Sequence, residues 1–405
     1  MGDILFIAHR VPYPPDRGDK IRAFNVLKYL AARRRVHLVA FADDRRDLTH
    51  SAALGRLVGE CRIVWRAKAN AVAALQALLT RQPVSLTAFA NPALRAAVDD
   101  ILARHAIDAI YVFSSQMAQY LPARAANGGR TRTLMDFCDV DSAKFEQYGR
   151  TTGGVRGWMM RREAKLLLAH DRAVAASVDA SLFVSAAEAD LFVARTGAGH
   201  VRAVENGIDT AAFDPAAPFE RVDGTAELIV FTGQMDYQPN VEAVTWFADA
   251  VLPGIRRRHP AVRFAIVGRN PSAAVARLAE RPGVTVTGEV ADVRGWLAAA
   301  AVVVAPLKLA RGVQNKVLEA MAMARPVVAS TAAAHGIDHA GTIRIGADER
   351  ALAEAVVALL ADPVAAATLG QAARARVIER YGWDARLAPL DALVGLPAAP
   401  LANAA

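Results

Sequence analysis

The chain has 405 residues, 54% hydrophobic and 22% charged, with a net charge of +8 at pH 7 and a pI near 9.8. This composition is that of a globular protein with ample core, and the length favours two domains at roughly 100–200 residues each. The densest basic clusters, at 32–36 and 254–260, fall at predicted helix ends, where cations complement the helix dipole. They lack the interleaved aromatic residues of a nucleic-acid surface, so we expect no nucleic-acid partner.

The cysteine content and the apolar runs both indicate a cytoplasmic protein. Only Cys61 and Cys138 are present, and two distant cysteines form neither a disulfide framework nor a metal site. The N-terminus lacks the basic segment of a signal peptide. The longest apolar run, 296–307, is shorter than the ~20 residues of a membrane span.

In the first half of the chain, short β-branched runs alternate with longer Ala- and Leu-rich stretches. Such nearly continuous apolar runs are typical of strands buried on both faces of a parallel sheet, with helices between them. The pattern therefore predicts a Rossmann-like, doubly wound α/β domain over 1–205. Its predicted strands are 3–9, 36–42, 62–65, 109–113, 132–137 and 180–185.

The alternation stops in a turn-rich segment, 206–226, and then restarts. We interpret this segment as an interdomain linker and 227–372 as a second Rossmann-like domain. We expect a helical segment at 373–395 to pack back towards the N-terminal domain, followed by a tail at 396–405. Ligands of such sheets bind at the carboxyl ends of the strands, here across a cleft between two domains. The predicted strands are 227–233, 262–268, 284–288, 301–306, 325–330 and 342–346.

Loops that follow strands are the candidate ligand contacts. After the first strand, Gly18 precedes a predicted helix whose first amides suit an anion, although a plain turn glycine explains it equally. The loop has neither G-x-G-x-x-G nor a P-loop, so we expect no nicotinamide or ATP cofactor. In the second half, Gly233 permits a close turn and Asn240 is a candidate helix cap. Arg269 ends a strand, and Asp292 is predicted to cap a helix.

The stretch from Arg311 to Glu319 is the most informative loop. The amides of residues 312–314 are predicted to open a helix, with Arg311 and Lys316 adding positive charge. An anionic phosphate suits such a helix start, and a carboxylate further along suits the vicinal hydroxyls of a ribose. A salt bridge between Glu319 and Lys316 remains an equally weighted alternative.

Five motifs in this half resemble the retaining glycosyltransferases of family 4, which have the GT-B fold. Their order and spacing match that family over about 170 residues. The N-terminal "HRVPYPPDRGDKIRAFNVLKYL" and "MDFCDVDSAKFEQYG" are similar to the sugar transferases associated with the exosortase/PEP-CTERM system. The five motifs are "ENGID" (205–209), "FTGQMDYQPN" (231–240), "IVGRNP" (266–271), "GEVADVRGWLAAAAVVVAPL" (288–307) and "VLEAMAMARPVVAS" (317–330).

The resemblance implies roles for particular residues. Glu319 matches the second glutamate of the family's E-x7-E motif, which holds the donor ribose. Residues 312–314 match the turn that holds the donor diphosphate, and Gly233 and Gly18 match glycines facing the donor phosphates. The expected donor-binding residues are Gly18, Gly233, Gln234, Asn240, Arg269, Gly312, Val313, Gln314, Asn315, Lys316 and Glu319.

Three positions depart from the family. Arg311 replaces the first glutamate of E-x7-E, and Gln234 and Asn240 replace the donor-loop Arg and Lys. A departing diphosphate still needs positive charge, which this fold generally supplies with helix dipoles and Arg or Lys instead of a metal. We therefore expect Lys316, with Arg311 or Arg269, to supply it. The predicted catalytic residues are Lys316, Glu319 and Arg311.

The first half is expected to bind the acceptor through His9, Asp139, Asp141 and Lys144. A helix-capping cluster explains the last three equally well, and a strand-end His is more often structural. Although Asp139 and Asp141 match the letters D-x-D, their context argues against a metal, and no cofactor is expected. In retaining enzymes of this fold the donor phosphate is thought to accept the acceptor proton, so no protein base is assigned.

The leading hypothesis is a metal-independent retaining glycosyltransferase of exopolysaccharide or cell-surface glycan synthesis. Its partners would be a nucleotide-sugar donor and a saccharide or lipid-linked acceptor. A nucleotide-sugar epimerase of the same fold and a catalytically degenerate nucleotide-sugar-binding scaffold remain alternatives. The basic, Trp-bearing stretch at 155–162 offers a peripheral contact with an anionic membrane surface, but so short a stretch is more often an ordinary surface helix.

Overall fold

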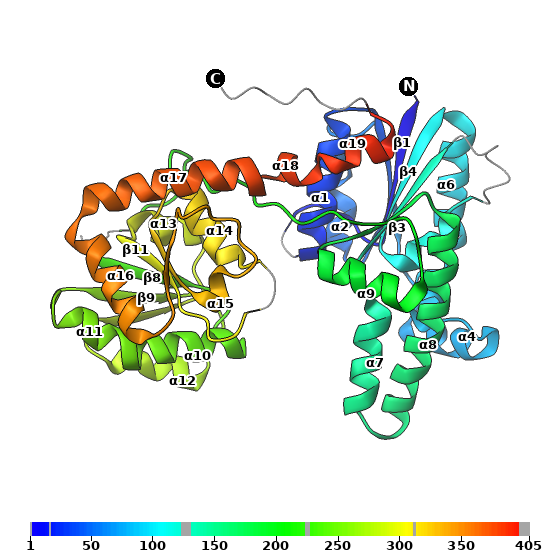
Figure 1. Cartoon of the computed structure of the whole chain (residues 1–405). Helices are drawn as coiled ribbons and strands as arrows, with labels where there is room; N and C mark the ends of the chain where they lie inside the picture. Colours follow the sequence, from blue (N-terminus) through cyan, green and yellow to red (C-terminus); the bar gives the residue numbers. More distant parts are fainter. Residues whose placement is uncertain (1, 16–17, 123–130, 223–226, 311–312, 397–405) are drawn as a thin grey trace. The chain divides into compact units, whose positions relative to one another are not determined.

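The computed structural model describes residues 2–15, 18–122, 131–222, 227–310 and 313–396 (Figure 1). The chain divides into two compact units. The first comprises Met1–Asn206 and Arg386–Ala405, and the second comprises Gly207–Ala385. The boundary thus falls at the start of the segment predicted as a linker, and the described part of that segment from Gly207 onward belongs to the second unit.

The first unit is built on a seven-stranded parallel sheet in the order β3-β2-β1-β4-β5-β6-β7. The chain moves outward from β1 in one direction and from β4 in the other, which is the doubly wound arrangement that the apolar runs predict. Its strands are β1 (Asp3–Ala8), β2 (Val36–Ala42), β3 (Glu60–Trp65), β4 (Ile107–Phe113), β5 (Arg132–Cys138), β6 (Ala180–Phe183) and β7 (Val201–Ala203).

Helices cover this sheet, and a fully buried layer of Leu5, Ile7, Val39, Ile110 and Val112 forms the centre of its core. The helices are α1 (Gly18–Ala31), α2 (Arg45–Thr49), α3 (Ser51–Gly55), α4 (Asn70–Thr80), α5 (Val84–Ala88), α6 (Pro92–Arg104), η1 (Ser115–Tyr120), α7 (Asp141–Thr151), α8 (Gly154–Ser177), α9 (Ala186–Thr196) and α19 (Pro389–Val394).

The second unit has a six-stranded parallel sheet in the order β10-β9-β8-β11-β12-β13. Its winding also reverses once, between β8 and β11, so the prediction of two doubly wound α/β domains is confirmed. The strands are β8 (Leu228–Thr232), β9 (Arg263–Val267), β10 (Val284–Gly288), β11 (Val302–Ala305), β12 (Val327–Ser330) and β13 (Arg344–Gly346).

The helices of the second unit alternate with these strands along the chain. They are α10 (Gln238–Trp246), η3 (Phe247–Val251), α11 (Leu252–Arg256), α12 (Ala273–Ala276), η4 (Arg277–Glu280), α13 (Val293–Ala299), α14 (Asn315–Ala322), α15 (Thr331–Ala334), α16 (Glu349–Ala361) and α17 (Pro363–Tyr381). The short helix α18 (Trp383–Leu387) spans the boundary at residue 385/386. Among the described residues, no single helix is long and apolar enough to cross a membrane; α16 and α17 qualify only as a pair with a 108° bend.

The C-terminal segment is divided between the units. On the first unit, the Tyr29 hydroxyl donates to the Asp391 carboxylate over 2.9 Å, and Arg132 donates to the Ala392 carbonyl over 2.8 Å. In the second unit, Arg374 of α17 donates to the carbonyls of Ala322 and Phe213. Residues 386–395 therefore pack on the N-terminal domain as expected for 373–395, whereas residues 373–385 belong to the other unit.

A buried ionic network holds the end of the first unit. Arg22 of α1 is almost fully buried, and its Nε donates to the Asp136 carboxylate over 2.9 Å. The same guanidinium donates to the Val204 carbonyl and the Asn206 side chain over 2.8 and 2.9 Å. Tyr111 also donates to Asp136. The network thus fixes β5 and the last residues before the unit boundary to one helix.

Candidate functional site

The turns that follow β8 and β9 touch one another closely. The Gly233 amide donates to the Val267 carbonyl over 3.0 Å. A Cβ placed on Gly268 would lie 1.6 Å from the Gly233 carbonyl oxygen, so no larger residue fits at position 268. This close approach fixes the backbone of Gly233 at the carboxyl end of β8.

Beside Gly233 lie two side chains that come from different helices. Lys316 of α14 donates from Nζ to the Asn240 Oδ1 of α10 over 2.5 Å. The Asn240 amide in turn donates to the Gln234 carbonyl over 2.8 Å. A Cβ on Gly233 would lie 2.8 Å from the Asn240 amide nitrogen and 3.1 Å from the lysine nitrogen, so both side chains crowd this turn. The amine of Lys316 thus contacts Asn240, the residue at which the resemblance implies a lysine.

Lys316 is held in a largely apolar environment. Its Nζ lies 4.1 Å from the centroid of the Phe231 ring, which favours a cation over its face. Burial nevertheless lowers the pKa of Lys316 from 10.5 to about 7, and only the attraction of Glu319 opposes that shift. The amine therefore gives up its proton unusually easily, and a neighbouring anion would restore its charge.

Glu319 lies one turn beyond Lys316 on α14. Burial raises the pKa of its carboxyl group, and Lys316 opposes that shift. Among the described residues, no hydrogen bond or ion pair reaches this carboxylate, and Lys316 points to Asn240 instead. The alternative of a Glu319–Lys316 salt bridge is therefore not the arrangement seen. The carboxylate keeps its lone pairs for another donor.

The start of α14 differs from the prediction. The helix begins at Asn315 with Gln314 as its N-cap residue, so Val313 precedes the helix and does not open it. Glu319 consequently lies about one turn into the helix. Arg311 and Gly312, predicted to add a cation and a phosphate-binding amide, lie outside the described residues.

Of the two predicted helix caps in the second unit, one is confirmed and one is wrong. Asp292 caps α13 as expected, accepting from the Arg294 amide over 2.9 Å. The prediction that Asn240 caps α10 is wrong, because that helix begins at Gln238 and Asn240 is buried within its first turn. Arg269 and Gln234 are exposed and lie together, with the guanidinium 3.4 Å from the Gln234 side-chain oxygen. Arg269 is thus near the Gly233 turn, but its side chain is exposed to solvent.

In the first unit, His9 follows β1 and is buried. Its ring stacks on Phe113 with centroids 5.7 Å apart, and its Nε2 lies 3.2 Å from the Asp19 carboxylate. Its Nδ1 is buried and has no partner among the described residues. Burial lowers the pKa of His9 despite the contact with Asp19, so the imidazole is neutral at pH 7. Helix α1, which carries Asp19, begins at Gly18, where a Cβ would meet no atom within 4 Å.

The acidic cluster after β5 is exposed and internally paired. Lys144 donates to Asp139 over 2.7 Å and to Asp141 over 3.2 Å. Partial burial works against the charge on Lys144, but the hydrogen bonds and the attraction of Asp139 and Asp141 together outweigh it, and the pKa of the amine rises. Asp141 is the first residue of α7, and the N-cap residue Val140 makes no side-chain cap. The capping alternative is therefore not seen, and neither is a free anion-binding group.

A polar hollow of about 840 Å³, which the sequence does not predict, lies at the carboxyl ends of β1, β2 and β3 in the first unit. Its charged side chains come from the loops and short helical turns that follow these strands. Lys20 in its wall is almost buried and lies 3.2 Å from Asp47. The only sequence signal for it is the charged residue that follows each strand. Its lining is Pro14, Lys20, Asp43, Asp44, Arg46, Asp47, Thr49, His50 and Arg66.

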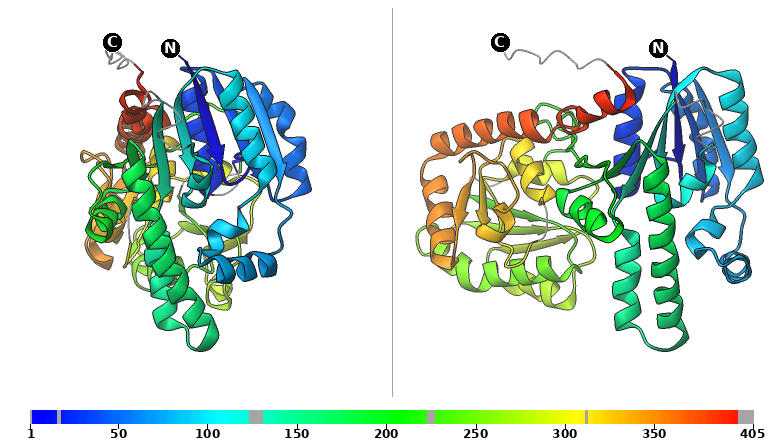
Figure 2. Two further views of the ribbon diagram at one scale, coloured as in Figure 1. Left: turned by 90° about the vertical axis from the view of Figure 1, so that its right-hand side faces the viewer. Right: turned by 45° about the vertical axis from the view of Figure 1, so that its right-hand side comes forward.

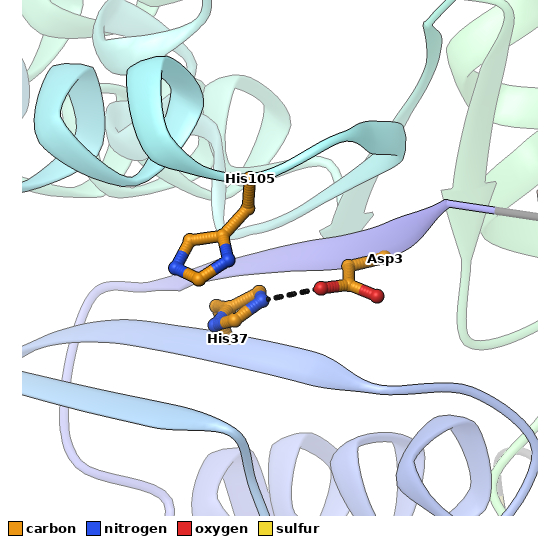
Figure 3. A group of neighbouring side chains, drawn as sticks. All are labelled: Asp3, His37 and His105. Atoms are coloured by element: carbon orange, nitrogen blue, oxygen red, sulfur yellow. Dashed lines mark hydrogen bonds and ion pairs between the residues drawn. The ribbon is translucent and has the colours of Figure 1, made fainter.

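At the opposite edge of that sheet, Asp3, His37 and His105 gather at the amino ends of β1, β2 and β4 (Figure 3). Their ligand atoms lie within 4.8 Å of one another, close enough for a metal ion. Each imidazole already has a carboxylate partner, however. His37 lies 2.8 Å from Asp3, and His105 lies 2.7 Å from Glu60. Both imidazoles are thus paired without a ligand, although the buried Nδ1 of His37 has no partner among the described residues. The group is remote from the strand ends that carry the candidate site.

Comparison with known proteins shows which family and which structures the chain is similar to. Residues 226–362 match the family model "Glycosyl transferases group 1". The alpha-maltose-1-phosphate synthase of Mycolicibacterium smegmatis is 34% identical over 208 residues, which are 45% of this chain and 53% of that protein. The chain therefore spans about half the length of this curated relative.

Solved structures match almost the whole chain at low identity. HepE of Anabaena in complex with UDP superimposes with a TM-score of 0.61 at 16% identity, covering 97% of this chain and 99% of HepE. WaaG, a glycosyltransferase involved in lipopolysaccharide biosynthesis, gives a TM-score of 0.59 at 15% identity over 97% of this chain and 100% of WaaG. The chain has the GT-B fold, and its residues 226–362 match the group 1 glycosyl transferases.

Proposed function

We propose that this protein is a cytoplasmic retaining glycosyltransferase of family 4 that acts in exopolysaccharide or cell-surface glycan synthesis. It would transfer a sugar from a nucleotide-diphosphate donor to a saccharide or lipid-linked acceptor. The observation that carries the proposal is the pair on α14. A half-buried amine with a pKa near 7 lies at the Gly233 turn, and a carboxylate without a hydrogen-bond partner among the described residues lies one turn away.

The donor would bind along α14. Its diphosphate would contact the Gly233 turn, Lys316 and the amides at the start of the helix, where the dipole favours an anion. Glu319 would accept hydrogen bonds from the two ribose hydroxyls. Structures of HepE with UDP and with UDP-glucose support a nucleotide donor for this fold.

The same groups would assist the chemistry. The bond between the sugar C1 and the diphosphate oxygen breaks, and negative charge grows on the diphosphate. Lys316, preorganised by Asn240 and Phe231, would stabilise that charge without a metal. The acceptor oxygen forms the new bond on the same face of the sugar, and its proton passes to the departing phosphate.

The acceptor would bind in the first unit. The polar hollow beside Lys20 and Asp47 offers donors and acceptors of both signs, which suits a hydroxyl-rich saccharide. His9, with its unpartnered Nδ1, is a further candidate to hold an acceptor hydroxyl. The exposed cluster of Asp139, Asp141 and Lys144 is a weaker candidate because its charges already satisfy one another.

A nucleotide screen followed by product analysis tests the function. We expect UDP, GDP or ADP to raise the melting temperature of the wild type, and the matching sugar nucleotide to lose its sugar to an added acceptor. Lys316→Met should reduce the thermal shift, whereas Lys165→Met, which changes an exposed lysine on α8, should leave the shift unchanged.

The same experiment separates the alternatives. Isomerised sugar formed without acceptor would indicate an epimerase. Nucleotide binding with no turnover would indicate a scaffold, a function that Gln234 and Asn240 in place of the family's cations would favour. No shift with any nucleotide would contradict all three functions.

A further inference from the structure

Helix α4 of the first unit buries its small apolar side chains and exposes its large ones. Its buried residues are the small side chains Ala73 and Ala77, whereas Val72, Leu75, Leu78 and Leu79 are 57%, 59%, 51% and 77% exposed. A helix that served only the core would bury its leucines and expose small or polar residues. The folding of this unit therefore does not explain the choice of side chains on α4.

The exposed residues form one continuous face. Positions 72, 75 and 79 follow the i, i+3, i+7 spacing of a single helix stripe, and Leu78 lies directly beside it. Scattered single apolar residues on a surface are ordinary, but four large ones on a helix of 11 residues form a patch. Such a patch indicates a surface that is covered by something else.

The patch continues onto the first turns of α8. Val155, Trp158 and Met159 are exposed there, and they share one helix face with Arg162. Arg162 crosses to α4, donating to the carbonyls of Ala77 and Gln82 over 2.6 and 3.2 Å. Both views of Figure 2 place α4 and the start of α8 at the same end of this unit.

The chain segments that carry the patch contain no carboxylate. Between Glu60 and Asp99 the chain has none, and between Glu146 and Glu163 it has none either. Arg62, Arg66 and Arg150 of these segments form ion pairs with carboxylates that lie outside them. Among the described residues, no ion pair is found for the other cations, which are Lys68, Arg81, Arg95, Arg156, Arg161 and Arg162.

We propose that this face docks onto the surface of an anionic phospholipid bilayer, with α4 lying in the headgroup region. Large aliphatic side chains, a tryptophan and nearby cations that are not neutralised by a carboxylate, such as Arg81 and Arg156, are the composition of an interfacial helix. A protein partner or a second copy of the chain would also cover the patch, but neither of them requires unpaired cations around it.

The place of this face in the fold gives docking a purpose. Helix α4 follows β3, and α7 and α8 follow β5, so the face projects from the carboxyl edge of the sheet. The polar hollow also lies at that edge. Docking would thus bring the hollow to the membrane surface. Its use for a lipid-linked acceptor rests on the proposed function, whereas binding to lipid does not.

Co-sedimentation with lipid vesicles tests the proposal. We expect the full chain to bind vesicles of equal parts phosphatidylcholine and phosphatidylglycerol, and to bind pure phosphatidylcholine far less. Leu75→Gln with Leu79→Gln should weaken binding at least about tenfold, because two leucines lose their burial in lipid. Arg81→Gln with Arg156→Gln should weaken it about fivefold or more and reduce its dependence on salt.

The matched control is Val364→Gln with Ile378→Gln, which removes two exposed apolar side chains from α17 and should leave vesicle binding unchanged. Nucleotide-induced thermal shifts should be equal in all these variants, so failure of this proposal and failure of the proposed function are distinguishable. The proposal would be overturned if the wild-type chain did not co-sediment with anionic vesicles. So would a concentration-dependent dimer, without vesicle binding, that the leucine variant abolishes.

Discussion

At the carboxyl ends of their strands, the two units handle charge in opposite ways. In the first unit, several ions are paired with a neighbour: Lys20 faces Asp47, Lys144 faces Asp139, and Arg66 faces Asp43. In the second unit, Lys316 is bonded to a neutral amide, and Glu319 has no hydrogen bond or ion pair among the described residues. Half-buried charges that lack a direct ion pair are costly, and such charges are typical of sites where a ligand supplies the partner. The contrast indicates an anionic ligand for the second unit and a neutral, hydroxyl-rich one for the first.

The largest expected effect tests whether the first unit's buried charges are structural. Arg22→Ala should lower the free energy of unfolding by about 3–5 kcal/mol, because it leaves the Asp136 carboxylate buried without its partner. Urea denaturation measures this. Arg350→Ala, which breaks an exposed ion pair with Glu354, should leave stability nearly unchanged. Equal effects of the two substitutions would remove the distinction between the units.

Lys316→Met should act on function instead of stability. We expect turnover to fall at least about a hundredfold, as when one preorganised donor to a developing charge is removed. The melting temperature should stay the same or rise, because burial disfavours the charged amine that methionine replaces. Steady-state kinetics and thermal melts measure both. A large loss of stability with normal turnover in the folded fraction would make Lys316 structural.

Glu319→Gln should separate the two halves of the donor. We expect UDP, or whichever nucleotide binds, to lose about tenfold in affinity, because a charged acceptor of ribose hydroxyls becomes a neutral one. Inorganic pyrophosphate, which has no ribose, should bind as tightly as before or better. Calorimetry with both ligands measures this, and equal losses for both would refute the ribose assignment.

The lowered pKa of Lys316 predicts how donor binding depends on pH. With the free amine at a pKa of about 7 and a bound anion raising it, binding takes up a proton above neutrality. Affinity should be constant below pH 7 and should fall by up to about tenfold per pH unit above it. Calorimetry in buffers of different ionisation enthalpy reports the proton. Lys316→Met should show a flat profile over the same range.

The smallest effect is expected at Arg269. Its guanidinium is exposed, so Arg269→Gln should weaken donor binding only a few-fold and only at low salt. A loss as large as that of Lys316→Met would move the main positive charge from the buried amine to the surface.

The strands of both units could be predicted from the sequence because continuous apolar runs mark strands buried on both faces. Their ends agree within two residues, and among the described strands only β7 was missed, a three-residue edge strand without a fully buried residue. The site was predicted only in part. Lys316 and Glu319 could be singled out as charges on an apolar helix, but the bond from Lys316 to Asn240 joins residues 76 positions apart.

The same limit applies elsewhere in the chain. The pairing of Arg22 with Asp136 spans 114 positions, and no local pattern announces it. The reversed face of α4 looks in sequence like an ordinary apolar helix, because hydrophobicity alone does not say which side meets the core. Distant contacts and the direction of burial are properties of the tertiary structure.

The contact between Gly268 and Gly233 couples the loop after β9 to the loop after β8, so neither can move without the other. With 1.6 Å between a hypothetical methyl carbon and the neighbouring oxygen, even alanine at 268 would push the loop after β8 out of place. The Gly233 turn, which we propose to contact the donor diphosphate, is therefore held in one shape by the neighbouring loop before a ligand binds. Affinity for the diphosphate would then depend on a residue that never touches it.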